Sequence, residues 1–185
     1  TVRGITHLGG TIIGTTNRGD PLNWRTLNDD GSINFIDRSQ EVIGSLAALN
    51  IDALIAVGGD GSLSIAQKLF EEGLNVIGIP KTIDNDLRVT DHCPGYGSAA
   101  RFVAHAFQGD DRDNRSLMGV KINVVMGRHA GWLTAASTLG RRNEEDGPHL
   151  VYLPERVFDP EQFLADVAEV HSRLGRCVVA VSEGI

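Results

Sequence analysis

Residues 54–67 read LIAVGGDGSLSIAQ, and this stretch decides the fold. Four apolar residues, Leu54 to Val57, have the composition of a buried strand, and two glycines follow them at once. A helix is predicted to start after Ser62 and to end at Gly73, because glycine is common just beyond the last helical turn. The stretch therefore predicts a strand, a glycine turn and a helix in succession.

The same alternation of strands and helices continues along the chain. One helix is predicted from about Asp37, where Gln40 completes a capping box, and another is predicted to begin near Trp132. A third runs from the N-cap Asp159 to Gly175. Residues 14–32 are polar and are predicted to form a loop. The alternation predicts an α/β fold, in which helices sandwich a largely parallel sheet made of segments 52–57, 75–79, 120–125, 150–153 and 177–181.

Composition, net charge and cysteine content exclude several classes of function. The 185 residues are 41% hydrophobic, enough for a buried core of single-domain size, and the net charge of −7 disfavours nucleic-acid binding. The apolar runs are too short to span a membrane, so no membrane association is expected. Cys93 and Cys177 form no CxxC pair, which fits free thiols in a reducing, cytoplasmic compartment. The chain starts at Thr1 and ends directly after a strand-like run, so residues 1–185 are expected to be incomplete at both ends.

Polar motifs follow the carboxyl ends of the predicted strands, where open α/β sheets bind ligands. The glycines of GGDGS (58–62) allow close approach to phosphate, the helix after them offers free N–H groups, and Asp60 is a candidate Mg²⁺ ligand. PKTIDND (80–86) offers Asp84 and Asp86 beside a lysine and a threonine, and MGRHAG (126–131) offers Arg128. A carboxylate base, a cation and a metal ligand are the groups that phosphoryl transfer to an alcohol needs.

The alternative reading of these motifs is structural, because glycine, aspartate and asparagine are also ordinary turn residues. No P-loop, GxGxxG with a following acidic residue, or GxSxG elbow occurs in the chain. His129 and the other histidines share no spacing, and no catalytic role is predicted for them.

The motifs IAVGGDGSLSIA, GIPKTIDND, VVMGRHAGW, YLPE and VAVSEG resemble the phosphofructokinases in order and spacing over nearly the whole chain. The resemblance implies a Rossmann-like phosphofructokinase domain, a glycolytic kinase that converts fructose 6-phosphate to fructose 1,6-bisphosphate, and a homo-oligomer, either dimer or tetramer. It implies that Asp84 is the general base, with Thr82 and Arg128 as further catalytic groups. It implies that the sugar phosphate is bound by Thr82, Asp84, Asp86, Met126, Gly127, Arg128 and Glu183.

The same resemblance implies ATP as the phosphoryl donor, with pyrophosphate as the alternative. The implied donor-binding residues are Arg18, Gly59, Asp60, Gly61, Ser62 and Lys81, with Asp60 also the ligand of Mg²⁺. Gly61 resembles the ATP-using members and favours ATP, whereas Lys81 resembles the pyrophosphate enzymes. Two other functions compete with this reading: another kinase with a GGDG loop, such as an NAD or lipid kinase, and a noncatalytic sugar-phosphate or nucleotide sensor on the same scaffold.

Overall fold

A computed structural model describes residues 3–16 and 19–185, and it has the expected α/β architecture. The chain forms two compact units, one of residues 1–55 and 64–77 and the other of residues 56–63 and 78–185. Within the described ranges, no helix combines the length and the apolar character that crossing a bilayer requires.

The first unit begins with a β-hairpin that the sequence did not predict. After a short 3₁₀ turn η1 (Pro21–Asn23), β1 (Trp24–Leu27) pairs antiparallel with β2 (Ile33–Ile36). The predicted loop 14–32 was therefore wrong over β1, which has no strictly alternating apolar pattern to mark it. Helix α1 (Ser39–Ala48) follows the hairpin.

The start of α1 differs from the predicted capping box. The N-cap position is Arg38, and Asp37 Oδ1 accepts a hydrogen bond from the backbone N–H of Ser39 at 2.8 Å. Gln40 does not reach back to the helix start, because its amide donates to Glu72 Oε2 at 2.8 Å. Gln40 therefore bonds Glu72, which is distant in the sequence but lies in the same unit, instead of capping its own helix.

Three elements contribute residues to both units. Strands β3 (Leu54–Gly58) and β4 (Val76–Pro80) form a two-stranded sheet, and α2 (Asp60–Glu71) connects them. These bounds lie within two residues of the predicted strands, although α2 begins before Ser62. The helix thus starts inside the GGDGS motif, and Asp60 is its first residue.

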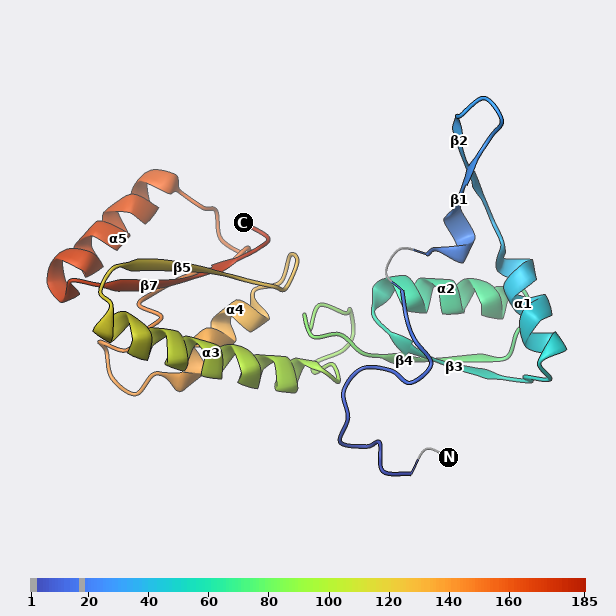
Figure 1. Ribbon diagram of the computed structural model, residues 1–185, viewed down its shortest axis with the longest axis horizontal. Coiled ribbons are helices and arrows are strands. Elements are labelled where there is room, and N and C mark those ends of the chain that lie inside the picture. Colours follow the sequence, from blue (N-terminus) through green and yellow to red (C-terminus); the bar gives the residue numbers. More distant parts are fainter. Residues whose placement is uncertain (1–2, 17–18) are drawn as a thin grey trace. The chain divides into compact units, whose positions relative to one another are not determined.

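The second unit is built on a parallel sheet of order β5-β7-β6, formed by β5 (Val120–Val125), β6 (Leu150–Tyr152) and β7 (Cys177–Ser182). Figure 1 shows α3 (Tyr96–Ser116) and α5 (Pro160–Leu174) on opposite sides of β5 and β7. Between β5 and β6 lie the short α4 (Trp132–Ala136) and the 3₁₀ helix η2 (Ser137–Gly140). The prediction of a parallel sheet covered on both faces is confirmed here.

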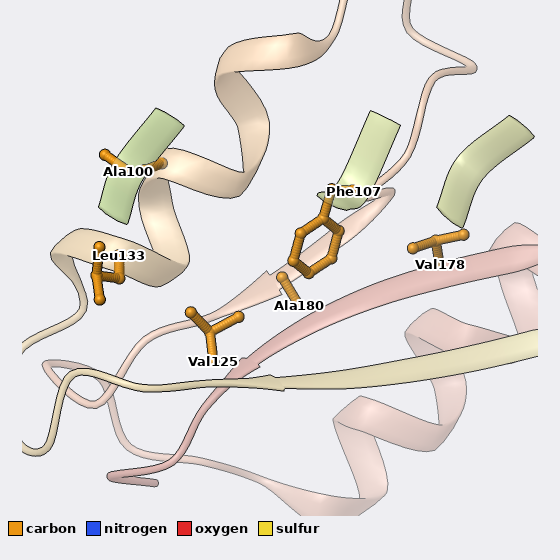
Figure 2. Packing of buried hydrophobic residues seen from close by; sticks show 7 residues of the cluster. Ala100, Phe107, Val125, Leu133, Val178 and Ala180 are labelled. Carbon is orange, nitrogen blue, oxygen red and sulfur yellow. The ribbon is translucent and has the colours of Figure 1, made fainter. Parts of the chain in front are cut away.

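Each face of this sheet has its own apolar cluster. On the α3 face, the side chains of Phe107, Val125, Leu133 and Ala180 are buried together, as Figure 2 shows. On the α5 face, Val170 packs with Cys177 and Val179 of β7, and both β7 residues are fully buried. The central strand is thus enclosed from both sides, as a parallel strand should be.

Local signals at α5 act as predicted. Asp159 Oδ1 accepts hydrogen bonds from two N–H groups of the first turn, Pro160 occupies the first helical position, and Gly175 ends the helix with φ +71°. No capping pattern of this kind predicted the 21-residue helix α3. After Phe107 the helix is polar, and the residues that it buries there are Asp111 and Asn114.

Candidate active site

The candidate site lies in the second unit, which contains the carboxyl ends of β3 and β4 together with β5, β6 and β7. The loops that follow β3 and β4 meet where Lys81 N–H donates to the carbonyl of Gly58 at 2.8 Å. The next residue, Thr82, is buried and bridges to Gly95, and its Oγ1 accepts a hydrogen bond from Asp84 N–H at 3.2 Å. These backbone contacts place the PKTIDND loop beside GGDGS.

Arg128 connects the loops electrostatically. Its Nη1 and Nη2 atoms lie 3.2 and 3.3 Å from Asp60 Oδ2, and its guanidinium also bonds Asp86 Oδ2. Its Nε lies 3.5 Å from Asp84 Oδ2. The three carboxylates come from positions 42 to 68 residues away along the chain. The structure thus brings together the acidic residues of two predicted motifs around the cation of a third.

The loop that carries Arg128 is held from the neighbouring strand. Glu183, directly after β7, accepts hydrogen bonds at Oε1 from the backbone N–H groups of Gly127 at 2.9 Å and Arg128 at 2.7 Å. Glu155, after β6, accepts from Gly131 N–H at 2.7 Å. Parallel pairing of β5, β7 and β6 aligns their carboxyl ends, so these carboxylates reach the same loop.

Close backbone approach explains one glycine of this region. A Cβ on Gly184 would lie 1.9 Å from the carbonyl oxygen of Arg128. Arg128 itself has φ +53°, a left-handed conformation that costs a residue with a side chain of order 1–3 kcal/mol. The two clamping carboxylates hold the loop in this conformation.

Asn85 is a site residue that the sequence analysis missed. It is buried, has φ +56°, donates from Nδ2 to the carbonyl of Asp91 at 3.2 Å, and accepts at Oδ1 from Cys93 N–H at 2.8 Å. Its side chain therefore fixes the peptide between Asp84 and Asp86. The available signal was its type, because asparagine tolerates the left-handed region better than most residues.

The carboxylates differ in their environment. The side chains of Asp84 and Asp86 are 15% and 16% exposed, against 64% for Asp60. Burial and the charge of Asp86 raise the pKa of Asp84, and Arg128 only partly offsets them. Hydrogen bonds from Arg128 lower the pKa of Asp60. A proton acceptor with a raised pKa thus lies near a carboxylate that stays ionised, which is a pattern of general-base sites.

The residues fit a magnesium ion only if a substrate completes its coordination. Among residues 3–16 and 19–185, no group of three or more acidic, histidine or cysteine side chains is placed to bind a metal. Asp60 offers an exposed carboxylate at the start of α2, and Asp86 Oδ1 is buried without a hydrogen-bond partner in the described part of the chain. Magnesium is commonly held by one or two carboxylates plus substrate phosphates, so this donor set fits.

The remaining predicted residues have different positions. Gly59, Gly61 and Ser62 lie in or beside the first turn of α2, and Lys81 is exposed beside them. Met126 is 60% exposed and lines an apolar hollow next to α3. Arg18 lies outside the described residues.

Comparison with known proteins identifies the family. The family model described as Phosphofructokinase matches residues 1–185. The chain belongs to the phosphofructokinase family. One relative in this family, the pyrophosphate–fructose 6-phosphate 1-phosphotransferase of Rhodospirillum rubrum, is 57% identical over 152 residues, covering 79% of this chain and 38% of the relative. The ATP-dependent 6-phosphofructokinase 1 of Nostoc is 36% identical over 179 residues, covering 96% and 47%.

Solved phosphofructokinase structures share the fold. The pyrophosphate-dependent phosphofructokinase of Marinobacter aquaeolei superposes with a TM-score of 0.70 at 36% identity, covering 85% of this chain and 43% of that one. The chain thus spans less than half the length of each of these three phosphofructokinases. The prediction of a phosphofructokinase-like α/β fold is confirmed.

Proposed function

We propose that residues 1–185 are the first catalytic region of an enzyme that phosphorylates the 1-hydroxyl of fructose 6-phosphate. The observation that carries the proposal is the grouping of Asp60, Asp84 and Asp86 around Arg128 at the carboxyl ends of the strands. The relatives of both donor types are named for transfer to fructose 6-phosphate or as 6-phosphofructokinases, which supports the same substrate here.

The chemistry follows from the residues. Asp84 accepts the proton of the sugar hydroxyl, because its raised pKa gives it more basicity than an exposed aspartate has. Thr82 positions Asp84 through the hydrogen bond to its N–H group. Arg128 exchanges its carboxylate partners for the oxygens of the transferring phosphoryl group and stabilises the charge that develops there. Asp60 would hold Mg²⁺, which when bound neutralises the charge of the donor phosphates.

We propose pyrophosphate as the first candidate for the phosphoryl donor. Lys81 is exposed beside the start of α2, where its ammonium can bind a small phosphate donor, and the 57% identical relative is named for pyrophosphate. One observation favours ATP as the second candidate. A Cβ on Gly61 would meet no atom within 4 Å, so the first turn of α2 leaves room for a nucleotide.

The test uses a chimera in which residues 1–185 replace their counterpart within the Rhodospirillum rubrum relative, so that the relative supplies the polypeptide on both sides. Asp84→Asn should lower kcat by at least ~10²-fold, the usual contribution of general-base catalysis. The matched control is Asp29→Asn, an exposed carboxylate in the hairpin turn, which should leave kcat unchanged. A folded Asp84→Asn chimera that turns over normally would remove Asp84 from this role.

The donor test compares kcat/KM for pyrophosphate and ATP in the same chimera. Gly61→Asp adds a negative charge where a nucleotide α-phosphate would lie and should abolish ATP use while sparing pyrophosphate. Lys81→Gly should reduce pyrophosphate use more than ATP use. An unmodified chimera that strongly prefers ATP would overturn the pyrophosphate proposal.

Three further expectations stay predictions. The enzyme that contains this chain should be a homo-oligomer, should reside in the cytoplasm, and should need residues outside 1–185 to complete its sugar-phosphate site. Activity of the 185-residue chain by itself would contradict the last of these.

A further inference from the structure

The guanidinium of Arg128 bridges two carboxylates of the site in the way that a shared cation does. Its Nη2 atom bonds both Asp60 Oδ2, at 3.3 Å, and Asp86 Oδ2. Its Nη1 lies 3.2 Å from the same Asp60 oxygen, and its Nε lies 3.1 Å from the same Asp86 oxygen. One positive group is thus the common partner of one oxygen from each carboxylate.

This arrangement leaves Asp86 without an oxygen that is open to another cation. Its Oδ2 accepts from Arg128, and its Oδ1 is buried without a hydrogen-bond partner in the described part of the chain. Asp60 also bonds Arg128, although its side chain is 64% exposed. Magnesium is commonly held by one or two carboxylates plus substrate phosphates. The second carboxylate therefore becomes available to a metal ion only when the guanidinium moves away.

The backbone of Arg128 is fixed, whereas the end of its side chain has room to move. Glu183 accepts hydrogen bonds from the N–H groups of Gly127 and Arg128. The carbonyl of Arg128 lies so close to Gly184 that a Cβ there would be 1.9 Å from its oxygen. The Arg128 side chain, in contrast, is 47% exposed and has several rotatable bonds. Rotation about these bonds can take the guanidinium off the carboxylates without a change in the loop.

Stabilisation of the fold is a weaker explanation for these ion pairs. Ion pairs between exposed side chains contribute little to stability, and the Arg128–Asp60 pair is of this kind. The nearby carboxylates of Asp84 and Asp86 are only 15% and 16% exposed, and like charges in a poorly solvated site repel each other. A positive group is therefore required here as long as no metal ion is bound.

We propose that Arg128 is a placeholder cation: in the substrate-free enzyme its guanidinium keeps the Asp60–Asp86 pair closed to divalent metal ions. This inference rests on the proposed function, which assigns a divalent ion to Asp60. Phosphate oxygens of the donor offer the guanidinium new partners and complete the coordination of the metal ion. Metal and donor then favour each other's binding, because both depend on the departure of Arg128 from the two carboxylates.

Binding of Mn²⁺ alone tests the proposal without any need for turnover. Mn²⁺ prefers the same oxygen ligands as Mg²⁺, and its free concentration is measured by electron paramagnetic resonance. The chimera described above is titrated without donor or sugar at about pH 8, where the carboxylates are ionised. Arg128→Met should lower the Kd for Mn²⁺ at least ~10-fold, a usual size for coupling between two binding events. Arg128→Gln is a second neutral replacement and should give the same result.

A double-mutant cycle with Asp86 distinguishes a placeholder from a general effect of charge. In the unmodified chimera, Asp86→Asn should change the Kd for Mn²⁺ less than ~2-fold, because Arg128 keeps this carboxylate closed. In the Arg128→Met background, Asp86→Asn should raise the Kd at least ~10-fold, because the carboxylate is now a ligand. Arg156→Met is the matched control for the loss of a positive charge, because Arg156 is exposed in the loop after β6. It should leave the Kd nearly unchanged.

Two results would overturn the placeholder role. The first is an Arg128→Met chimera, folded by circular dichroism, that binds Mn²⁺ no more tightly than the unmodified chimera. The second is an equal effect of Asp86→Asn in both backgrounds, which would show that Arg128 acts on the metal only through its charge at a distance. Neither result depends on turnover, so the proposed function would stand in both cases. Normal kcat of Asp84→Asn, in turn, would count against the proposed base and leave the Mn²⁺ result unaffected.

Discussion

Removal of the Asp111 carboxylate should destabilise the second unit more than any other loss of a single charge there. Asp111 accepts hydrogen bonds from Arg176 Nη1, from Arg115 Nε at 3.0 Å and from Gly147 N–H at 3.0 Å. The side chains of Arg176 and Asp111 are only 6% and 8% exposed. Asp111→Ala therefore leaves a buried guanidinium and a buried N–H group without their acceptor.

The loss of unfolding free energy on Asp111→Ala depends on which partner of Asp111 is buried. Loss of one member of a buried ion pair costs about 3–5 kcal/mol, whereas an exposed pair contributes about 0–1 kcal/mol. Arg115 is 44% exposed, so its share is small and the buried pair with Arg176 dominates. Asp113→Ala is the control on the same helix, because Asp113 is 57% exposed and pairs with Lys121. It should cost about 1 kcal/mol or less.

The assay is urea unfolding followed by the fluorescence of Trp132. A Trp24→Phe background makes Trp132 the sole tryptophan and restricts the signal to the second unit. Replacement of the pair by Asp111→Leu with Arg176→Met should recover most of the lost free energy of unfolding, because apolar packing often replaces a buried ion pair without loss. If Asp111→Ala unfolds within about 1 kcal/mol of Asp113→Ala, the reasoning from burial is refuted.

Two further predictions concern the loop at Arg128 and the effect of acid. Gly184→Ala should displace the carbonyl of Arg128 and lower kcat of the chimera at least ~10-fold, because the added Cβ would overlap that oxygen. Gly119→Ala is the control, because a Cβ at Gly119 meets no atom within 4 Å and should leave kcat unchanged. Equal kcat values in the two variants would contradict the contact at Gly184. Burial lowers the pKa of His149 below 6.5, and its neutral Nδ1 accepts from Val178 N–H at 2.8 Å. The stabilisation by neutral His149 should be complete above pH 6.5 and be lost as pH falls through the folded-state pKa. His149→Asn should therefore make the urea midpoint fall less steeply with pH below pH 6.5. An unchanged pH dependence of the urea midpoint would argue against this role of His149.

Local patterns predicted much of the second unit. The bounds of β5 agree with the predicted segment 120–125, and those of β6 and β7 differ from prediction by one residue. These strands are short apolar runs between turn residues, and their order in a parallel sheet explains why the motifs share one edge. Helix α3 was missed for the complementary reason. After Phe107 it buries Asp111 and Asn114, which bond Arg176 and the carbonyl of Gly119 outside the helix, so no apolar period marks this part of α3.

The sequence by itself determined the family, the parallel α/β architecture and the residue types available for phosphoryl transfer, because each depends on short motifs and local periodicity. Only the tertiary structure decided that Arg128 lies among Asp60, Asp84 and Asp86. It also decided that Glu183 and Glu155 hold the loop of Arg128, and that the Asn85 side chain bonds Asp91 and Cys93. These contacts join groups up to 68 residues apart. Their geometry comes from strand register and burial, and neither is encoded in any single segment of the chain.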